Sequence, residues 1–110
     1  MPTTQADLGD WIADYADEPD KVREFCIRHG ILERVRTTIE LARRNFPPIE
    51  KLTLSIWKDP LEGTEKAYVF LEVRSGYEEA REGDRRFRPQ WVKALPFPER
   101  DQIRFSYTIV

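Results

Sequence analysis

The chain has one cysteine and one histidine, Cys26 and His29, which lie three residues apart on one predicted helical turn. A zinc site would need one or two further Cys, His or carboxylate ligands, and no other Cys or His is present. A cysteine nucleophile would need a positioned base, but His29 leans away from Cys26 toward the helix end. We therefore predict that no metal binds and that Cys26 is a small core residue without a chemical role, on the helix face of Val22 and Phe25.

Carboxylates are numerous, but almost all lie beside charged or turn residues; the exception is Glu72, which lies within an apolar strand. A buried glutamate with a raised pKa can act as a general acid or base. The alternative is an ion pair with Arg74, two residues along, or with Arg104, across the sheet. The glycines are scattered and form no phosphate-binding loop. We predict no catalytic residue, no cofactor and no enzyme activity.

Aromatic and arginine side chains are expected together on the outer face of the predicted sheet, namely Trp57, Tyr68, Phe70, Arg74 and Arg104. Single-stranded nucleic acid stacks its bases on platforms of this kind. The alternative is that the N-terminal helices or a second copy of the chain cover this face. Three large bare aromatic rings would favour aggregation. We therefore predict that a helix, a second copy or a ligand covers Trp57, Tyr68 and Phe70.

A second basic surface is expected on the last helix, beside Phe87 and Trp91, and consists of Arg81, Arg85, Arg86, Arg88 and Lys93. The preceding helix adds two arginines on one side, Arg36 and Arg43. Arginine binds phosphate or carboxylate groups through paired hydrogen bonds. The alternative is a solvated face on which these arginines pair with neighbouring acids, namely Glu78, Glu79, Glu82 and Asp84.

Residues 1–20 form an acidic amphipathic segment with six acids and no base. Its apolar residues follow helical spacing and are Leu8, Trp11, Ile12 and Tyr15. Thr4 is a candidate N-cap, with Asp7 three residues later. A short acidic helix that carries Trp11 and Tyr15 is suited to lie across a basic surface of a partner protein and block it, as an antitoxin or inhibitor does.

Two more helices are predicted in residues 21–46. The first runs from about Lys21 to His29, with Gly30 as its C-cap, and Pro19 either stops the acidic segment or opens this helix. The second runs from about Leu32 to Phe46, where two prolines follow. Its apolar stripe is Leu32, Val35, Ile39, Ala42 and Phe46.

The pattern of residues 50–110 predicts a β-β-α-β unit. Apolar residues alternate with others in 52–57, 67–74 and 103–109, as expected for strands, and the turn at 59–63 makes the first two a hairpin. The helical connection places the third strand parallel to the second. Its neighbour in the sheet, the first strand or the second, stays open.

The helix in this unit is predicted to begin with a capping box of Ser75 and Glu78. Gly83, Asp84 and Pro89 interrupt its apolar stripe. Because proline removes one helical hydrogen bond and restricts the residue before it, we predict a kink or two short helices. Residues 83–89 would then be irregular, with free backbone N–H groups that favour an anion among the arginines.

The 110 residues and their composition predict one α+β domain of two layers, or three, with N-terminal helices followed by β-β-α-β and a three-stranded mixed sheet. A single cysteine allows no intrachain disulfide, and no signal peptide or membrane span is apparent, so we expect a cytoplasmic protein. The predicted function is a non-catalytic protein-interaction or regulatory module, and a homodimer is compatible with it. The alternative is a nucleic-acid-binding domain that uses the arginine cluster and the sheet aromatics.

Overall fold

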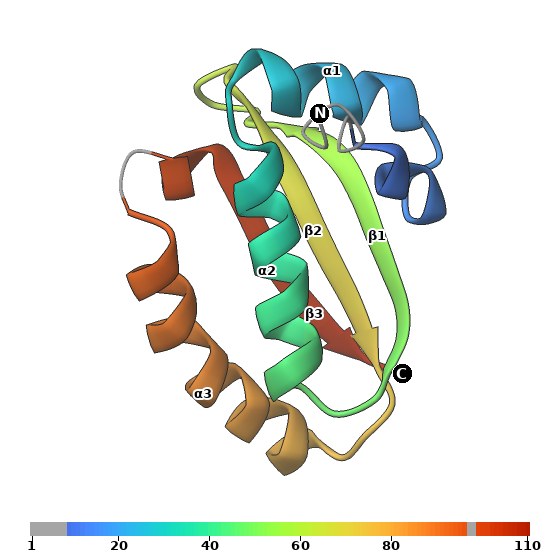
Figure 1. Ribbon diagram of the computed structural model, residues 1–110. Coiled ribbons are helices and arrows are strands. Elements are labelled where there is room, and N and C mark those ends of the chain that lie inside the picture. Colours follow the sequence, from blue (N-terminus) through green and yellow to red (C-terminus); the bar gives the residue numbers. More distant parts are fainter. Residues whose placement is uncertain (1–8, 97–98) are drawn as a thin grey trace, which may run out of the picture.

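The computed structural model describes residues 9–96 and 99–110 (Figure 1). Within these residues, two short 3-10 helices, three α-helices and three strands follow one another. Their order and bounds are η2 (Asp10–Asp14), α1 (Pro19–Arg28), α2 (Leu32–Asn45), β1 (Ile49–Lys58), β2 (Glu65–Val73), α3 (Tyr77–Ala94), η3 (Glu99–Gln102) and β3 (Ile103–Ile109). The predicted α+β class, with helices first and then β-β-α-β, is confirmed.

The three strands form one mixed sheet in the order β1-β2-β3. β1 and β2 are an antiparallel hairpin, and Leu54 lies opposite Val69. β3 runs parallel to β2, with Phe105 opposite Val69. The parallel direction of the third strand is confirmed, and the structure places this strand beside the second.

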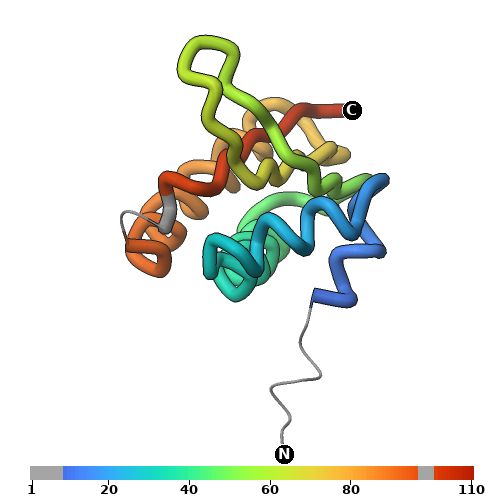
Figure 2. The backbone as a smooth tube through the Cα atoms, turned by 90° about the horizontal axis from the view of Figure 1, so that it is seen from above, coloured from blue at the N-terminus to red at the C-terminus, as the bar shows by residue number. Residues whose placement is uncertain are grey.

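The described helices lie on one side of the sheet, so the fold has two layers. Seen from above in Figure 2, the strands lie on one side and the helices on the other, while the turn of the β1–β2 hairpin projects away from the helices. Alternate residues of the strands fill the space between the layers, and Val69 and Leu71 of the central strand are fully buried. Val35 of α2 and Phe87 of α3 meet them from the helical layer.

The acidic N-terminal segment differs from its prediction. Thr4, Asp7 and Leu8 lie outside the described residues, and the chain from Asp10 forms only a short 3-10 helix. Gly9 enters this helix with a φ of 85°, and Ile12 is fully buried. The backbone N–H of Leu54 in β1 donates to the carbonyl of Tyr15 at 3.0 Å. Tyr15, which helical spacing assigned to a longer helix, is instead hydrogen-bonded to the edge of β1.

The prediction of an irregular segment at 83–89 is wrong, because α3 is continuous through Gly83 and Pro89. Its first residue follows Gly76, whose N–H donates to the Glu79 carboxylate at 3.3 Å, so the capping residues are not Ser75 and Glu78. Proline removes one helical hydrogen bond at Pro89, but the buried Phe87 keeps this part of the helix packed on the sheet.

Gly83 serves close packing in α3. A Cβ added at Gly83 would lie 2.9 Å from the carbonyl oxygen of Asn45 at the end of α2. The same carbonyl accepts a hydrogen bond from Arg86 at 2.9 Å, and the Asn45 and Gln90 amides bond each other at 3.1 Å. The glycine therefore lets two helices touch, where the sequence was interpreted as a helix break.

Candidate functional site

The outer face of the sheet, on the side opposite the helices, carries the aromatic residues expected there. Strand register sets Ser55, Tyr68 and Arg104 in one row across β1, β2 and β3. The next row holds Phe70, between Thr53 and Ser106. Trp57 lies opposite Lys66, at the end of the face near the hairpin turn. We call Trp57, Tyr68, Phe70 and Arg104 the aromatic patch.

Contacts within the aromatic patch hold its side chains in place. The Arg104 guanidinium lies over the Trp57 ring, 4.4 Å from the ring centre, and 5.9 Å from the centre of the Tyr68 ring. The Tyr68 hydroxyl and the Ser106 hydroxyl are 2.5 Å apart, and the rings of Tyr68 and Phe70 are 5.9 Å apart. These contacts within the chain hold the side chains of the aromatic patch in defined orientations.

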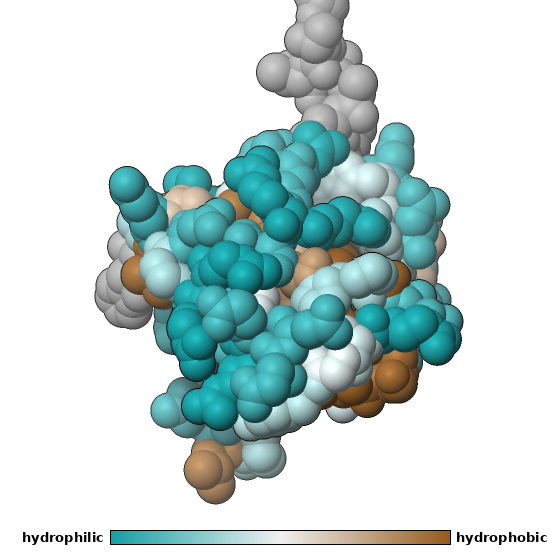
Figure 3. All heavy atoms as spheres, turned by 90° about the horizontal axis from the view of Figure 1, so that it is seen from below, coloured by the Kyte–Doolittle hydropathy of each residue, from teal (hydrophilic) through white to brown (hydrophobic). Residues whose placement is uncertain are grey.

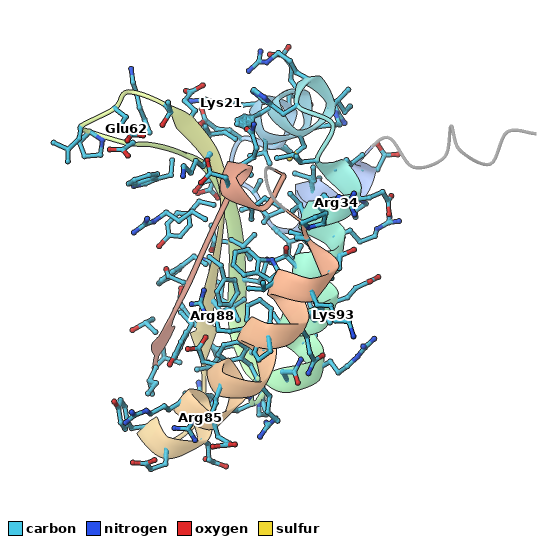
Figure 4. All side chains as sticks on the ribbon, turned by 90° about the vertical axis from the view of Figure 1, so that its left-hand side faces the viewer. Lys21, Arg34, Glu62, Arg85, Arg88 and Lys93 are labelled. Atoms are coloured by element: carbon cyan, nitrogen blue, oxygen red, sulfur yellow. The ribbon has the colours of Figure 1, made fainter. Side chains whose placement is uncertain are left out.

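The aromatic patch is open to solvent on its outer side in the described structure. Trp57, Tyr68 and Phe70 are each half-buried by their neighbours in the sheet, and none is among the most exposed apolar residues. In Figure 4 the side chains of this face point away from the helical layer, on the side to which the hairpin turn with Glu62 also extends. No described helix covers the patch, so cover by a second copy or by a ligand remains the prediction.

Charged residues lie at the two ends of this face. At one end Lys51 is opposite Glu72, whose other neighbour is Thr108. At the other end Lys66 lies 3.5 Å from Asp101. Neither arginine expected to pair with Glu72 does so, because Arg74 pairs with Glu50 and Arg104 lies over Trp57. Glu72 is half-buried in the sheet, with Lys51 opposite it in the strand register.

Arg74 lies just beyond β2 and takes no part in the aromatic patch contacts. It donates to Glu50 at 2.8 Å, and both side chains are exposed. This contact lowers the pKa of Glu50 below its ordinary value, mainly through the hydrogen bond and then through the charge. Arg74 therefore ties the end of β2 to the start of β1.

The arginine cluster of α3 is divided between two sides of the helix. Arg85 pairs with Glu82 at 2.6 Å, and Arg86 reaches the end of α2. Arg88 pairs with Asp84 at 2.8 Å on the side of β3, and its guanidinium lies 5.1 Å from the centre of the Phe105 ring. Figure 3, seen from below toward the start of α3, shows a mostly hydrophilic surface. Pairing with acids, the alternative interpretation, describes most of the cluster.

Trp11 and Tyr15 make contacts within the domain. Both are half-buried and pack against the core. Arg36 of α2 lies 5.4 Å from the centre of the Trp11 ring, and Arg43 donates to the Tyr15 hydroxyl at 3.0 Å. The idea that these two rings face a partner is therefore not supported, because α2 already holds them.

Cys26 is fully buried beside Val22 and Phe25, as predicted. Burial raises the pKa of its thiol to about 11, so the thiolate that chemistry would require is disfavoured. The His29 ring packs on Phe25 with 4.3 Å between the ring centres. Within residues 9–96 and 99–110, no three His, Cys, Asp or Glu side chains are grouped as metal ligands.

Ser106 lies beside the aromatic patch and was missed by sequence reasoning. Its hydroxyl fixes Tyr68 from the neighbouring strand, and this contact depends on which strand lies beside β2. The alternation that placed Arg104 on the outer face places Ser106 there too, two residues later. The sequence therefore indicated the face on which Ser106 lies, but it did not give the strand register that brings Ser106 next to Tyr68.

Comparison with models of known protein families, with curated proteins and with solved structures finds no match. In the part of the chain that the structure describes, no helix is both long enough and apolar enough to cross a membrane.

Proposed function

We propose that this domain is a non-catalytic protein-binding module whose partner docks on the aromatic patch of the sheet. The observation that carries the proposal is a two-layer fold with all described helices on one face and an ordered set of Trp57, Tyr68, Phe70 and Arg104 on the other. An open antiparallel hairpin normally presents polar side chains to water, so this composition needs another explanation.

The residue types of the patch favour a protein partner. Tryptophan, tyrosine and arginine are the residues that most often dominate binding energy at protein interfaces. Charged residues are depleted at the centre of such interfaces and retained at the rim. The outer face has this layout, because its two rows with Tyr68 and Phe70 contain one charge, Arg104, while Lys51, Glu72 and Lys66 lie at the ends.

The nucleic-acid alternative loses its main support. It combined the sheet aromatics with the arginine cluster, but α3 belongs to the helical layer on the opposite side of the sheet. Arg85, Arg86 and Arg88 are also engaged with carboxylates or with the end of α2. Few basic residues then remain beside the patch to follow a phosphate backbone.

Site-specific photo-crosslinking tests the proposed surface. A photoreactive phenylalanine analogue at position 70 should yield a discrete adduct with one cellular protein, and the adduct should persist after nuclease treatment. The matched control carries the same analogue at Val92, which is 48% exposed on α3 in the helical layer. The identified protein, once purified, should bind the unlabelled domain directly.

Three outcomes would contradict the proposal. They are equal crosslinking from positions 70 and 92, an adduct that disappears after nuclease treatment, and a purified protein that does not bind. A steep log-linear fall of affinity with salt would point instead to nucleic acid.

A further inference from the structure

The two edges of the sheet differ in how they are protected. The edge of β1 is covered in part by the N-terminal segment, where Ala16 bridges Leu54, and its pairing with β2 shifts register between Ile49 and Lys51. β3 is the opposite edge, and within the described residues β2 is the one strand that pairs with it. An edge strand turns alternate backbone N–H and C=O groups outward, where they can pair with another strand.

β3 has almost none of the features that block strand addition. It contains no proline, no lysine and no acid, and its sequence runs Ile-Arg-Phe-Ser-Tyr-Thr-Ile. Its one charged residue, Arg104, lies folded over Trp57 on the outer face. Proteins usually protect such an edge with charge, proline or a bulge. The chain shields the edge of β1 but leaves the edge of β3 open, and this difference favours β3 as the edge at which a further strand is added.

One side of α3 borders the open edge of β3. Tyr77, Arg81, Asp84 and Arg88 follow one another at spacings of four, three and four, so they share one side of the helix. All four influence the pKa of Tyr107 in β3, which is raised first by burial and then by Asp84. Figure 4 shows Arg88 between α3 and the strands, while Lys93 points away from them.

Arg81 is the residue on this side of α3 that can form an ion pair with a carboxylate of a partner. Arg88 already pairs with Asp84 at 2.8 Å. Arg81 is exposed and makes no ion pair with any described residue. A carboxylate carried by a strand beside β3 would gain a charge-assisted hydrogen bond there without breaking an internal one.

We infer that the open edge of β3 binds an extended segment of a protein partner as a fourth strand, and that an acidic residue of this segment pairs with Arg81. Backbone hydrogen bonds would supply affinity, and alternate side chains would supply specificity. On the helical side those side chains meet Tyr107 and Phe105, so apolar residues suit that face. This surface uses the backbone edge of β3, whereas the aromatic patch uses side chains of the outer face, so the two can be tested separately.

A second copy of the chain does not fit this edge. The Phe87 ring stacks on Phe105 at 4.4 Å, so α3 packs against the helical side of β3. If two β3 strands paired about a two-fold axis, their α3 helices would lie over adjacent strands, about 4.8 Å apart. Packed helices need roughly 8 to 10 Å between their axes. The occupant must therefore be a strand without a helix at that position.

Selection from a random twelve-residue peptide library displayed on phage tests the inference with the intact chain as bait. Enriched peptides should alternate apolar and polar residues and contain Asp or Glu. Arg81→Glu should weaken their binding by roughly tenfold or more, the scale of a hydrogen bond to a charged group. Lys93→Glu is the matched control, since it makes the same charge change on the far side of α3 and should leave affinity unchanged.

Amide hydrogen exchange on the complex reads the backbone directly. Alternate amides of β3 that do not bond β2 should exchange more slowly when peptide is bound, because they gain partners. A library that yields no binder, peptides that bind Arg81→Glu as tightly as wild type, or β3 amides with unchanged exchange would each overturn the inference. Phe70→Ser changes the aromatic patch on the central strand and leaves the Arg104–Trp57 contact in place, so it should not affect peptide binding. Failure here is therefore distinguishable from failure of the aromatic patch.

Discussion

Cys26 shows how burial decides the role of a single side chain. Its neighbours in α1 and the core exclude water, and this raises the pKa of the thiol from an ordinary value of 9.0 to about 11. The neutral thiol is then the stable form at physiological pH, and it behaves as a small apolar group. Burial thus disfavours the thiolate form on which metal binding or nucleophilic attack depends.

The raised pKa of Cys26 predicts a pH dependence of stability. Well below pH 9 the thiol is neutral in both states and contributes no pH dependence. Between pH 9.0 and about 11 the unfolded chain loses the thiol proton while the folded chain keeps it. The free energy of unfolding should therefore fall over this window, by roughly 2 to 3 kcal/mol at its end.

Urea denaturation of wild type and Cys26→Ala at several pH values checks this prediction. Subtraction removes the other groups that titrate in the same range, so the difference between the two proteins should shrink as the pH rises above 9. Parallel curves for the two proteins up to pH 11 would show that the thiol titrates normally in the folded state.

The contact between α2 and α3 shows why the helix break was mispredicted. Glycine and proline weaken a helix by local rules, and those rules favour an interruption at Gly83 and Pro89. The structure keeps the helix because Phe87 and Trp91 are buried against the sheet and Gly83 touches the end of α2. Such packing depends on residues about forty positions away in sequence, such as Asn45, so periodicity within the helix could not reveal it.

Gly83→Ala tests the close packing of α3 on α2, because close packing decides whether the substitution raises or lowers the free energy of unfolding. In an ordinary helix interior this change stabilises by about 0.5 to 1 kcal/mol. Here the added Cβ would meet the Asn45 carbonyl at 2.9 Å and the Cα of Phe46 at 3.0 Å, so α2 and α3 must separate. We expect a net loss of unfolding free energy, measured by urea denaturation. A more stable variant would contradict the close contact.

Pro89→Ala should have the opposite effect. Pro89 is exposed within α3, so the substitution removes no buried contact and restores one helical hydrogen bond to the carbonyl of Arg85. Proline in a helix interior costs about 3 kcal/mol relative to alanine, and part of this should be regained as stability. A thermal melt measures the gain. An unchanged or lower melting temperature would indicate that residues around Pro89 are not helical in solution.

The features of the fold that depend on local sequence patterns were predictable. Period-two alternation predicted all three strands, and helical spacing with Pro47 and Pro48 predicted α2 almost to the residue. The acidic segment was misassigned because Trp11 and Tyr15 fit helical spacing, whereas contacts with Arg36, Arg43 and the edge of β1 decide its structure. Strand register joined Tyr68 to Ser106, and no local pattern carries that information.

At the scale of the molecule, the account depends on the asymmetry between a sheet face packed with helices and a face left open. The open face concentrates residues typical of interface centres, and the arginines that would have favoured nucleic acid lie in the other layer. The described structure therefore has one ordered aromatic patch and one open strand edge.

Calorimetric titration with the purified partner from position-70 crosslinking tests the aromatic patch most directly. The double variant Trp57→Ser and Phe70→Ser should lose at least tenfold in affinity, because the aromatic residues that dominate an interface commonly contribute about 2 kcal/mol or more each. Ile27→Ser is the matched control, since this residue is 52% exposed on α1 in the helical layer. If the control loses affinity while the double variant, correctly folded by circular dichroism, binds as tightly as wild type, the aromatic patch is not the binding surface.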